Sequence, residues 1–215
     1  MKKRSGQHVG TRKRISVRRK RPSTPEAPVS PNAVFLVGFM GAGKTSVGRA
    51  LGQRLNWIFE DLDARIERRE GRTIAEIFRD SGEAEFRLAE RAALQQVMEK
   101  LREGVAAVVA LGGGTFAQPR VHQLLQESGI ETVFLEAPLT ELWQRCVLQE
   151  TGAKRPLQDS QNLFRERYEA RRRFYETASR RICTSGKQVE AIAAEIAQML
   201  GLKKVVMRSE QGESE

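Results

Sequence analysis

The segment GFMGAGKTS, residues 38–46, fits the pattern G-x-x-x-x-G-K-[ST] in full. It follows the apolar run AVFLVG (33–38), which is typical of a strand buried on both faces of a parallel sheet. A helix is predicted to follow over about residues 43–55. Glycines between a strand and a helix let backbone N–H groups turn inward, and the helix N-terminus adds partial positive charge. The segment therefore predicts a loop that binds the phosphates of a nucleoside triphosphate.

Individual roles within this loop follow from the chemistry of its side chains. Lys44 can reach the β- and γ-phosphates, and the Thr45 hydroxyl can coordinate Mg²⁺. The alternative is a plain glycine-rich turn with a stray lysine, which the complete pattern in its expected context disfavours. We assign nucleotide contacts to Gly41, Ala42, Gly43, Lys44, Thr45 and Ser46.

Further strands and helices alternate along the chain. Strands are predicted at 57–61, 105–111, 131–138 and 180–185. Helices are predicted over about 63–71 and 82–102, between the later strands and after the last strand. Thr73 and Glu76 have the spacing of a capping box, which predicts a further helix between 71 and 82. This alternation predicts an α/β domain with a parallel sheet.

Basic charge is concentrated at the N-terminus. The chain has 37 Lys and Arg against 27 Asp and Glu, and residues 1–22 contain ten of the basic residues and no acidic one. The remainder is neutral, so the net charge of +10 says nothing about the partner of the folded part. We predict a disordered basic and Pro/Ser-rich extension over 1–31, a folded domain over 32–202 and a flexible tail over 203–215.

Compartment and partners follow from what the sequence contains. The apolar run 105–111 is far too short to cross a bilayer, and no apolar core follows the charged N-terminus as it does in a secretory signal. Cys146 and Cys183 lie far apart in the sequence and do not form a metal-type cluster. We interpret both as ordinary packing residues of a protein in a reduced compartment. We expect a cytoplasmic, monomeric protein without a membrane partner. The basic extension is either a solvated tail or an arm that binds nucleic acid or another polyanion weakly.

The acceptor of the phosphoryl group requires a second set of residues. Asp61 and Asp63 stand two apart at the end of a predicted strand, where side chains i and i+2 point to the same side. Ligands of open α/β sheets collect at the carboxyl ends of the strands, so we expect this pair to face the phosphate loop. A carboxylate there could hold Mg²⁺ through water, or accept a proton from an attacking hydroxyl. The alternative is that Asp63 only caps the next helix.

Three other segments are candidates for the same site. The glycines at 112–114 end a strand and allow a close backbone approach to a ligand, although a plain turn is equally compatible. Arg87 has acidic residues three and four positions away, so a surface charge ladder is the alternative. Arg171 lies in the run RRR and could be solvated. The polar loop at about 150–162 reads as a mobile lid, on which Arg155 could neutralise charge on the γ-phosphate, unless it is an ordinary loop.

Taken together, the motifs GFMGAGKT, DLD, GEAEFR, LGGGT, KRPL and RRRFY resemble the shikimate kinase family in their order and spacing. The resemblance covers the chain from about residue 33 to the last helix. It implies a three-layer α/β/α fold of the nucleoside monophosphate kinase type, with a five-stranded parallel sheet and a lid. It also implies transfer from ATP, with Mg²⁺, to the 3-hydroxyl of shikimate in chorismate and aromatic amino acid biosynthesis. Leu62 and Gln158 depart from the residues that are usual in the family.

The resemblance also implies roles for individual residues. Asp63 matches the aspartate that orients the attacking hydroxyl, and Asp61 matches the acid near Mg²⁺. Arg87 and Arg171 match the arginines that hold the substrate carboxylate. The remaining matches are Gly112, Gly113 and Gly114 on the substrate side, Lys44 and Thr45 at the phosphates, and Arg155 on the lid. The alternatives are another small-molecule kinase, for gluconate or a nucleotide, and a polyanion-binding module with a regulatory nucleotide site.

Overall fold

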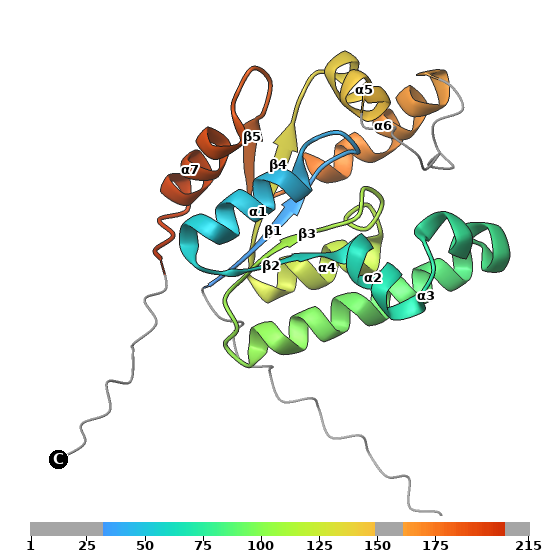
Figure 1. The fold of residues 1–215 in the computed structure, drawn as a ribbon, viewed down its shortest axis with the longest axis horizontal. Coiled ribbons are helices and arrows are strands. Elements are labelled where there is room, and N and C mark those ends of the chain that lie inside the picture. Colours follow the sequence, from blue (N-terminus) through green and yellow to red (C-terminus); the bar gives the residue numbers. More distant parts are fainter. Residues whose placement is uncertain (1–31, 149–160, 205–215) are drawn as a thin grey trace, which may run out of the picture.

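The computed structural model describes residues 32–148 and 161–204 (Figure 1). The strands are β1 (Ala33–Val37), β2 (Ile58–Asp61), β3 (Ala107–Ala110), β4 (Glu131–Glu136) and β5 (Arg180–Cys183). The helices are α1 (Lys44–Leu55), α2 (Leu62–Glu70), α3 (Ile74–Arg102), α4 (Pro119–Ser128), α5 (Leu139–Leu148), α6 (Gln161–Tyr175) and α7 (Val189–Met199). Each predicted strand is present but shorter, because residues at the ends of the predicted segments lie outside the regular strands.

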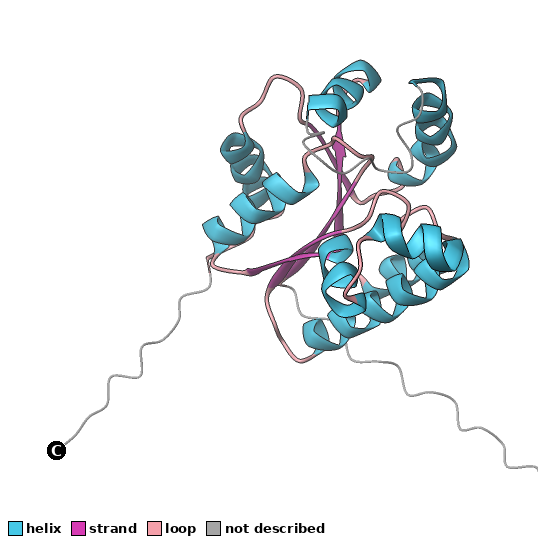
Figure 2. Cartoon of the chain, turned by 45° about the vertical axis from the view of Figure 1, so that its right-hand side comes forward, coloured by secondary structure: helices cyan, strands magenta, loops and turns pink. Residues whose placement is uncertain are grey.

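All five strands form one parallel sheet in the order β2-β3-β1-β4-β5. The sheet lies between two layers of helices, with α1 and α7 on one face and α3 and α4 on the other (Figure 2). This is the three-layer α/β/α arrangement expected from the sequence. Because β1 is central, all five of its residues are buried.

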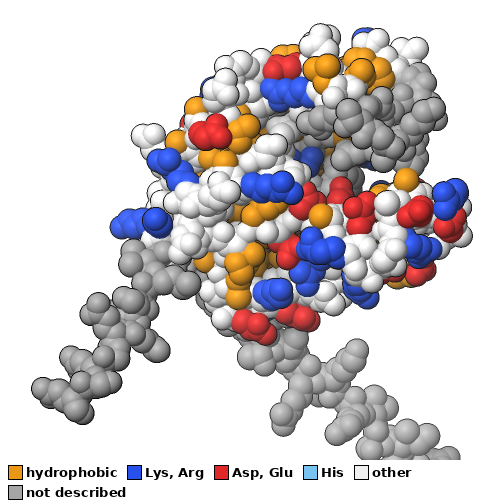
Figure 3. Space-filling view, viewed as in Figure 1, with side chains coloured by type: hydrophobic (Ala, Val, Ile, Leu, Met, Phe, Trp, Pro, Cys, Tyr) orange, Lys and Arg blue, Asp and Glu red, His pale blue; other side chains and the backbone are white. Residues whose placement is uncertain are grey.

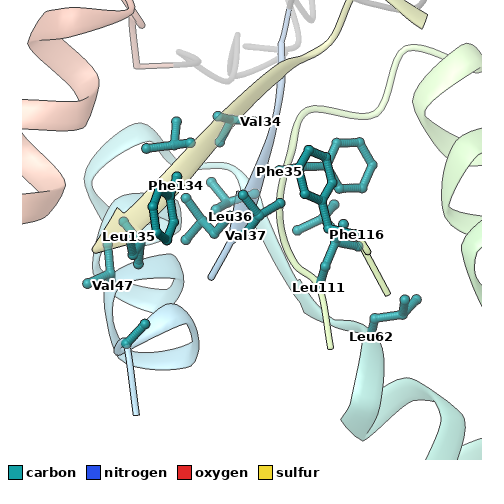
Figure 4. Packing of buried hydrophobic residues seen from close by; sticks show 14 of the residues in the cluster. Val34, Phe35, Leu36, Val37, Val47, Leu62, Leu111, Phe116, Phe134 and Leu135 are labelled. Carbon is teal, nitrogen blue, oxygen red and sulfur yellow. The ribbon is translucent and has the colours of Figure 1, made fainter. Parts of the chain in front are cut away.

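The core consists of the inner faces of the sheet and the helices that cover it. Figure 4 shows the β1 side chains at the centre, with Phe134 and Leu135 of β4 to one side and Leu111 and Phe116 to the other. Leu62, which departs from the family pattern, is fully buried in the same cluster. An apolar residue is therefore compatible with that position.

Local signals set the helix boundaries. Thr73 and Glu76 form the predicted capping box at the start of α3, in which each side chain bonds the backbone N–H of the other. Within α3, Gly82 has non-helical backbone angles, φ 77° and ψ 178°, so the helix is interrupted there. A second helical segment follows Gly82, where the sequence predicted a long helix to begin. Beyond the gap, α6 begins at Gln161, so the last two residues of the predicted lid are helical.

The strand order determines which loops meet. Because β3 lies between β2 and β1, the turn after β3 lies between the segments that follow β2 and β1. The glycine turn 112–114 is therefore placed between the start of α2 and the phosphate loop. This end of the sheet carries the candidate site.

Acidic and basic side chains are mixed over α2 and α3 on the face that Figure 3 shows. No helix in the described part of the chain combines the length and the apolar character needed to cross a membrane.

Candidate active site

The phosphate loop joins β1 to α1, and its backbone requires glycine. Gly41 and Gly43 have φ of 79° and 89°, in the left-handed region, and Gly43 is the N-cap of α1. A Cβ at Gly41 would lie 2.5 Å from the carbonyl oxygen of Leu142 in α5. The loop is therefore packed tightly against α5, and its N–H groups lead directly into the N-terminus of α1.

Lys44 lies across this loop. Its Nζ donates to the carbonyl oxygens of Gly38 at 2.9 Å and Phe39 at 3.0 Å. The ammonium group is therefore held beside the backbone that would surround a phosphate chain. Ala42 is buried below the loop, and Ser46 is exposed in the first turn of α1.

Thr45 and Asp61 connect the phosphate loop to the end of β2. The Thr45 hydroxyl donates to Asp61 Oδ2 at 2.7 Å. The other carboxylate oxygen, Oδ1, accepts from the backbone N–H groups of Asp63 at 3.1 Å and Ala64 at 3.3 Å, so Asp61 is the N-cap of α2. A carboxylate and a hydroxyl at the phosphate loop are the oxygen ligands that Mg²⁺ prefers.

The expectation that Asp61 and Asp63 point to the same side of an extended strand is wrong. The chain enters α2 at Leu62, so Asp63 is in the first helical turn, where the two-residue period of a strand no longer applies. The alternative that Asp63 caps the helix is also wrong, because Asp61 does so. The two carboxylates diverge: Asp61 meets Thr45, and Asp63 faces the glycine turn.

That turn contacts Asp63 at one end and two arginines at the other. A Cβ at Gly112 would lie 2.5 Å from Asp63 Oδ1. A Cβ at Gly114 would lie 3.3 Å from Arg87 Nη2 and 3.5 Å from Arg171 Nη2. The absence of side chains on this turn is thus what lets the three charged groups approach it.

Arg87 pairs with acidic residues of its own helix but is not a solvated surface group. Its Nη1 donates to Glu90 Oε2 at 2.8 Å, and its Nε and Nη2 donate to Glu83 Oε1 at 3.2 and 3.0 Å. Burial alone would lower the pKa of Arg87, but the hydrogen bonds and charges of Glu90 and Glu83 raise it overall. The guanidinium is therefore charged and has a defined orientation.

Glu90 ties Arg87 to the segment that follows the glycine turn. Its side chain is 1% exposed. Its Oε1 accepts from the Thr115 hydroxyl at 2.5 Å, and its Oε2 accepts from Gln118, the N-cap residue of α4. Both oxygens of this buried carboxylate therefore accept hydrogen bonds, and the carboxylate fixes α3, the start of α4 and the turn relative to one another.

Arg171 differs from its neighbours in the run RRR. Arg172 and Arg173 are exposed, and Arg172 pairs with Glu176 at 2.8 Å. Arg171 is partly buried, and its Cζ lies 5.9 Å from the centre of the Phe39 ring. Only one of the three therefore points to the glycine turn.

Helix α5 borders the phosphate loop on the side away from Asp63. Arg145 donates to the carbonyl oxygen of Gly41 at 3.4 Å and to Thr184 Oγ1 and O at 3.1 and 3.2 Å. Hydrogen bonding from Ser185 is the main cause of the lowered pKa of Glu141, to which Arg145 also donates. These contacts join the phosphate loop, α5 and the segment after β5.

The structure thus brings together every predicted site residue that it describes. The phosphate-loop residues and Asp61 form one group, and the glycine turn with Asp63, Arg87 and Arg171 forms an adjacent one. Arg155, Gln158 and lid residues 150–160 lie outside the described residues. Sequence reasoning assigned no role to Thr115, Gln118 or Tyr175, although two of them lie in the motifs LGGGT and RRRFY. Their contacts with the site come from tertiary packing.

This fold and this site define a class. A five-stranded parallel sheet in the order β2-β3-β1-β4-β5, with a phosphate loop after its central strand and two arginines and an aspartate at the adjacent glycine turn, is that of a P-loop kinase for small molecules. The family model for shikimate kinase matches residues 40–201. This chain belongs to the shikimate kinase family and is a phosphotransferase.

Individual relatives agree with this assignment. The chain is 42% identical over 178 residues to the shikimate kinase of Geobacter metallireducens, which covers 81% of this chain and 94% of that protein. It is 35% identical over 164 residues to that of Persephonella marina, covering 76% and 95% of the two chains. A solved structure of shikimate kinase from Acinetobacter baumannii, in complex with shikimate, has a TM-score of 0.71 and 33% identity, covering 79% of this chain and 92% of that one.

Proposed function

We propose that this protein transfers the γ-phosphoryl group of ATP to the 3-hydroxyl of shikimate, forming shikimate 3-phosphate for chorismate and aromatic amino acid synthesis. The observation that carries the proposal is the convergence of two guanidinium groups on Gly114, with a carboxylate at Gly112 two residues away. The Acinetobacter baumannii relative, which binds shikimate in its solved structure, supports the choice of acid.

Two arginines at one backbone position favour an anionic ligand. Guanidinium groups offer planar pairs of N–H donors that match a carboxylate. Arg87 already has acidic partners, whereas Arg171 approaches the same turn from a different helix. We assign the two arginines and the turn 112–114 to the carboxylate end of shikimate, which a neutral sugar lacks.

Asp63 is the group assigned to the acceptor hydroxyl. It lies in the first turn of α2 and stands against Gly112, two residues from the arginine end of the glycine turn. Phosphoryl transfer depends mainly on positioning and on charge stabilisation. The role of Asp63 is therefore to bind and orient the 3-hydroxyl and to accept its proton as the transfer proceeds.

The nucleotide end uses the phosphate loop. Its backbone N–H groups and Lys44 bind the phosphates, and Thr45 with Asp61 would hold Mg²⁺ directly or through water. When bound, Mg²⁺ supplies positive charge that offsets the charge of the β- and γ-phosphates. The family resemblance assigns Arg155, which lies outside the described residues, to the same phosphates.

The first test measures ADP release from ATP and Mg²⁺ by the purified protein, with shikimate, gluconate or nucleoside monophosphates supplied separately. We expect release above the acceptor-free background with shikimate alone. Release with gluconate or a nucleotide instead would overturn the assignment of the acceptor. Release with none of them would overturn the kinase assignment in favour of a nucleotide-binding module.

A Gly112→Ala variant tests the position of Asp63. The added Cβ would lie 2.5 Å from Asp63 Oδ1 and 2.8 Å from Thr115 Oγ1, which is too close, so the carboxylate must move. We expect kcat to fall roughly 10- to 100-fold, since small displacements of positioning groups are costly. Steady-state kinetics with shikimate measures this.

The control for that variant is Gly129→Ala. Gly129 has φ 67°, so alanine strains the backbone there, but a Cβ would have no atom within 4 Å. This control should lower the melting temperature and leave kcat unchanged. An unaltered kcat in Gly112→Ala would show that Asp63 does not act where we place it.

A further inference from the structure

Tyr175 is a buried polar residue with no part in the mechanism above. It is the last residue of α6 and is 0% exposed. Its ring stacks on Phe134 of β4, with centroids 5.4 Å apart and planes at 26°. The ring is therefore anchored in the core, and its hydroxyl has a fixed position.

The hydroxyl group bridges two parts of the substrate side. It donates to the carbonyl oxygen of Gly113, and the Arg171 guanidinium lies at the same residue, with Nη1 3.9 Å from the position of a Cβ at Gly113. Hydrogen bonding from Arg171 acts to lower the pKa of Tyr175, against the larger effect of burial. Burial raises the pKa of Tyr175, so the group stays protonated and able to donate over the whole physiological range. Since a hydroxyl can donate and accept at once, it can serve both partners, which phenylalanine could not.

The orientation of the Arg171 side chain depends on the groups that surround it. It lies one helical turn before Tyr175, with Phe39 on one side and the glycine turn on the other. A long side chain loses rotamer freedom when it binds a ligand, and a group that fixes it beforehand reduces that loss. The Tyr175 hydroxyl is such a group.

We propose that Tyr175 is a positioning residue for the substrate carboxylate, because its hydroxyl holds the Arg171 guanidinium against the turn at Gly113. This inference rests on the proposed function and deepens it. The hydroxyl does not touch the acid itself. It fixes the relative position of a side chain and a backbone segment that would both contact the acid.

A purely structural role makes a different prediction. If the hydroxyl only satisfies the Gly113 carbonyl, its removal would lower stability and leave the kinetics of a folded enzyme unchanged. If it orients Arg171, its removal raises KM for shikimate and leaves the nucleotide end unaffected. A change in KM for shikimate without a change in KM for ATP therefore distinguishes the positioning role from a purely structural one.

The experiment compares wild type with Tyr175→Phe in the full-length protein. We expect KM for shikimate to rise about fivefold, as for the loss of one hydrogen bond to a charged group, with kcat and KM for ATP within about twofold of wild type. The matched control is Tyr168→Phe. Tyr168 is the other tyrosine of the chain, also lies on α6, and packs its ring on Phe39 at 5.5 Å. It should leave KM for shikimate unchanged.

A double-mutant cycle with Arg171→Lys tests whether the effect passes through Arg171. We expect Tyr175→Phe to change KM for shikimate by less than about twofold in the Arg171→Lys background, because coupled residues are not additive. Full additivity, or an unchanged KM in the single variant, would overturn the role of Tyr175. A melting temperature measured on each variant shows that the folded enzyme is being compared.

The same series separates this inference from the proposed function. Wild-type protein that releases no ADP with shikimate would overturn the proposed function and the inference that rests on it. Wild-type protein that is active, together with a Tyr175→Phe variant of unchanged KM, would overturn the inference alone.

Discussion

Replacement of Asp63 by asparagine is expected to lower kcat for shikimate phosphorylation by about 100-fold or more, the range for a group that accepts a proton and orients the nucleophile. Asparagine has the same shape, so the contact with Gly112 is kept and the negative charge is lost. The side chain can no longer accept the hydroxyl proton. Steady-state kinetics gives kcat, and equilibrium binding of ATP gives the affinity at the other end of the site.

Nucleotide affinity should be unchanged in this variant, since Asp61 rather than Asp63 contacts the phosphate-loop residue Thr45. Asp80→Asn is the control, because Asp80 is exposed and pairs with Arg79 on the surface of α3. It should behave as wild type. Equal kcat values for Asp63→Asn and wild type would remove Asp63 from the reaction.

Replacement of Lys44 by alanine is expected to reduce kcat/KM for ATP by at least about 100-fold, as for the loss of a charged donor aimed at the transferred group. The ammonium is held at 2.9 and 3.0 Å from two carbonyl oxygens of the loop. Its removal takes away the positive charge at the phosphates and also the two bonds that fix the loop. Both kcat and nucleotide affinity should therefore fall, in contrast to Asp63→Asn.

Lys100→Ala provides the comparison for loss of a lysine. Lys100 is exposed in the last turn of α3 and is far along the sequence from the phosphate loop. Its kinetics should match wild type. A Lys44→Ala protein with wild-type turnover would contradict the assignment of the loop as the nucleotide site.

The fold was predictable because its signals are local. Apolar runs mark β1, β3 and β4, short mixed segments mark β2 and β5, and the Thr73–Glu76 spacing marks the start of α3. Strand ends were less predictable, because an apolar residue such as Leu111 can lie beyond the end of its strand and still be buried and bonded to β1. The divergence of Asp61 and Asp63 was missed for a related reason. Asp61 ends the strand β2 and Asp63 lies in the helix α2, so the two-residue period of a strand does not relate them.

Contacts between distant segments were beyond sequence reasoning. The spacing of Arg87 and Glu90 is the same in a surface ladder and in a buried pair, so only tertiary packing shows that Glu90 is buried. Tyr175 bonds a carbonyl group 62 residues away, and no spacing rule connects the two. The motif glycines and arginines, in contrast, were predictable because the resemblance to a family had already related them to one ligand.

The two acidic partners of Arg87 differ in a way that bears on how the site would receive an acid. Glu90 is 1% exposed and fully bonded, whereas Glu83 is 67% exposed and occupies the Nε and Nη2 edge of the guanidinium. That edge is the planar pair of donors that best fits an incoming carboxylate. Under the proposed function, substrate binding at Arg87 would be an exchange, in which the substrate carboxylate replaces the exposed Glu83 carboxylate while the buried Glu90 carboxylate stays. The affinity for the acid would then measure a difference between two ion pairs, and the Glu83 side chain would set how readily the acid displaces it.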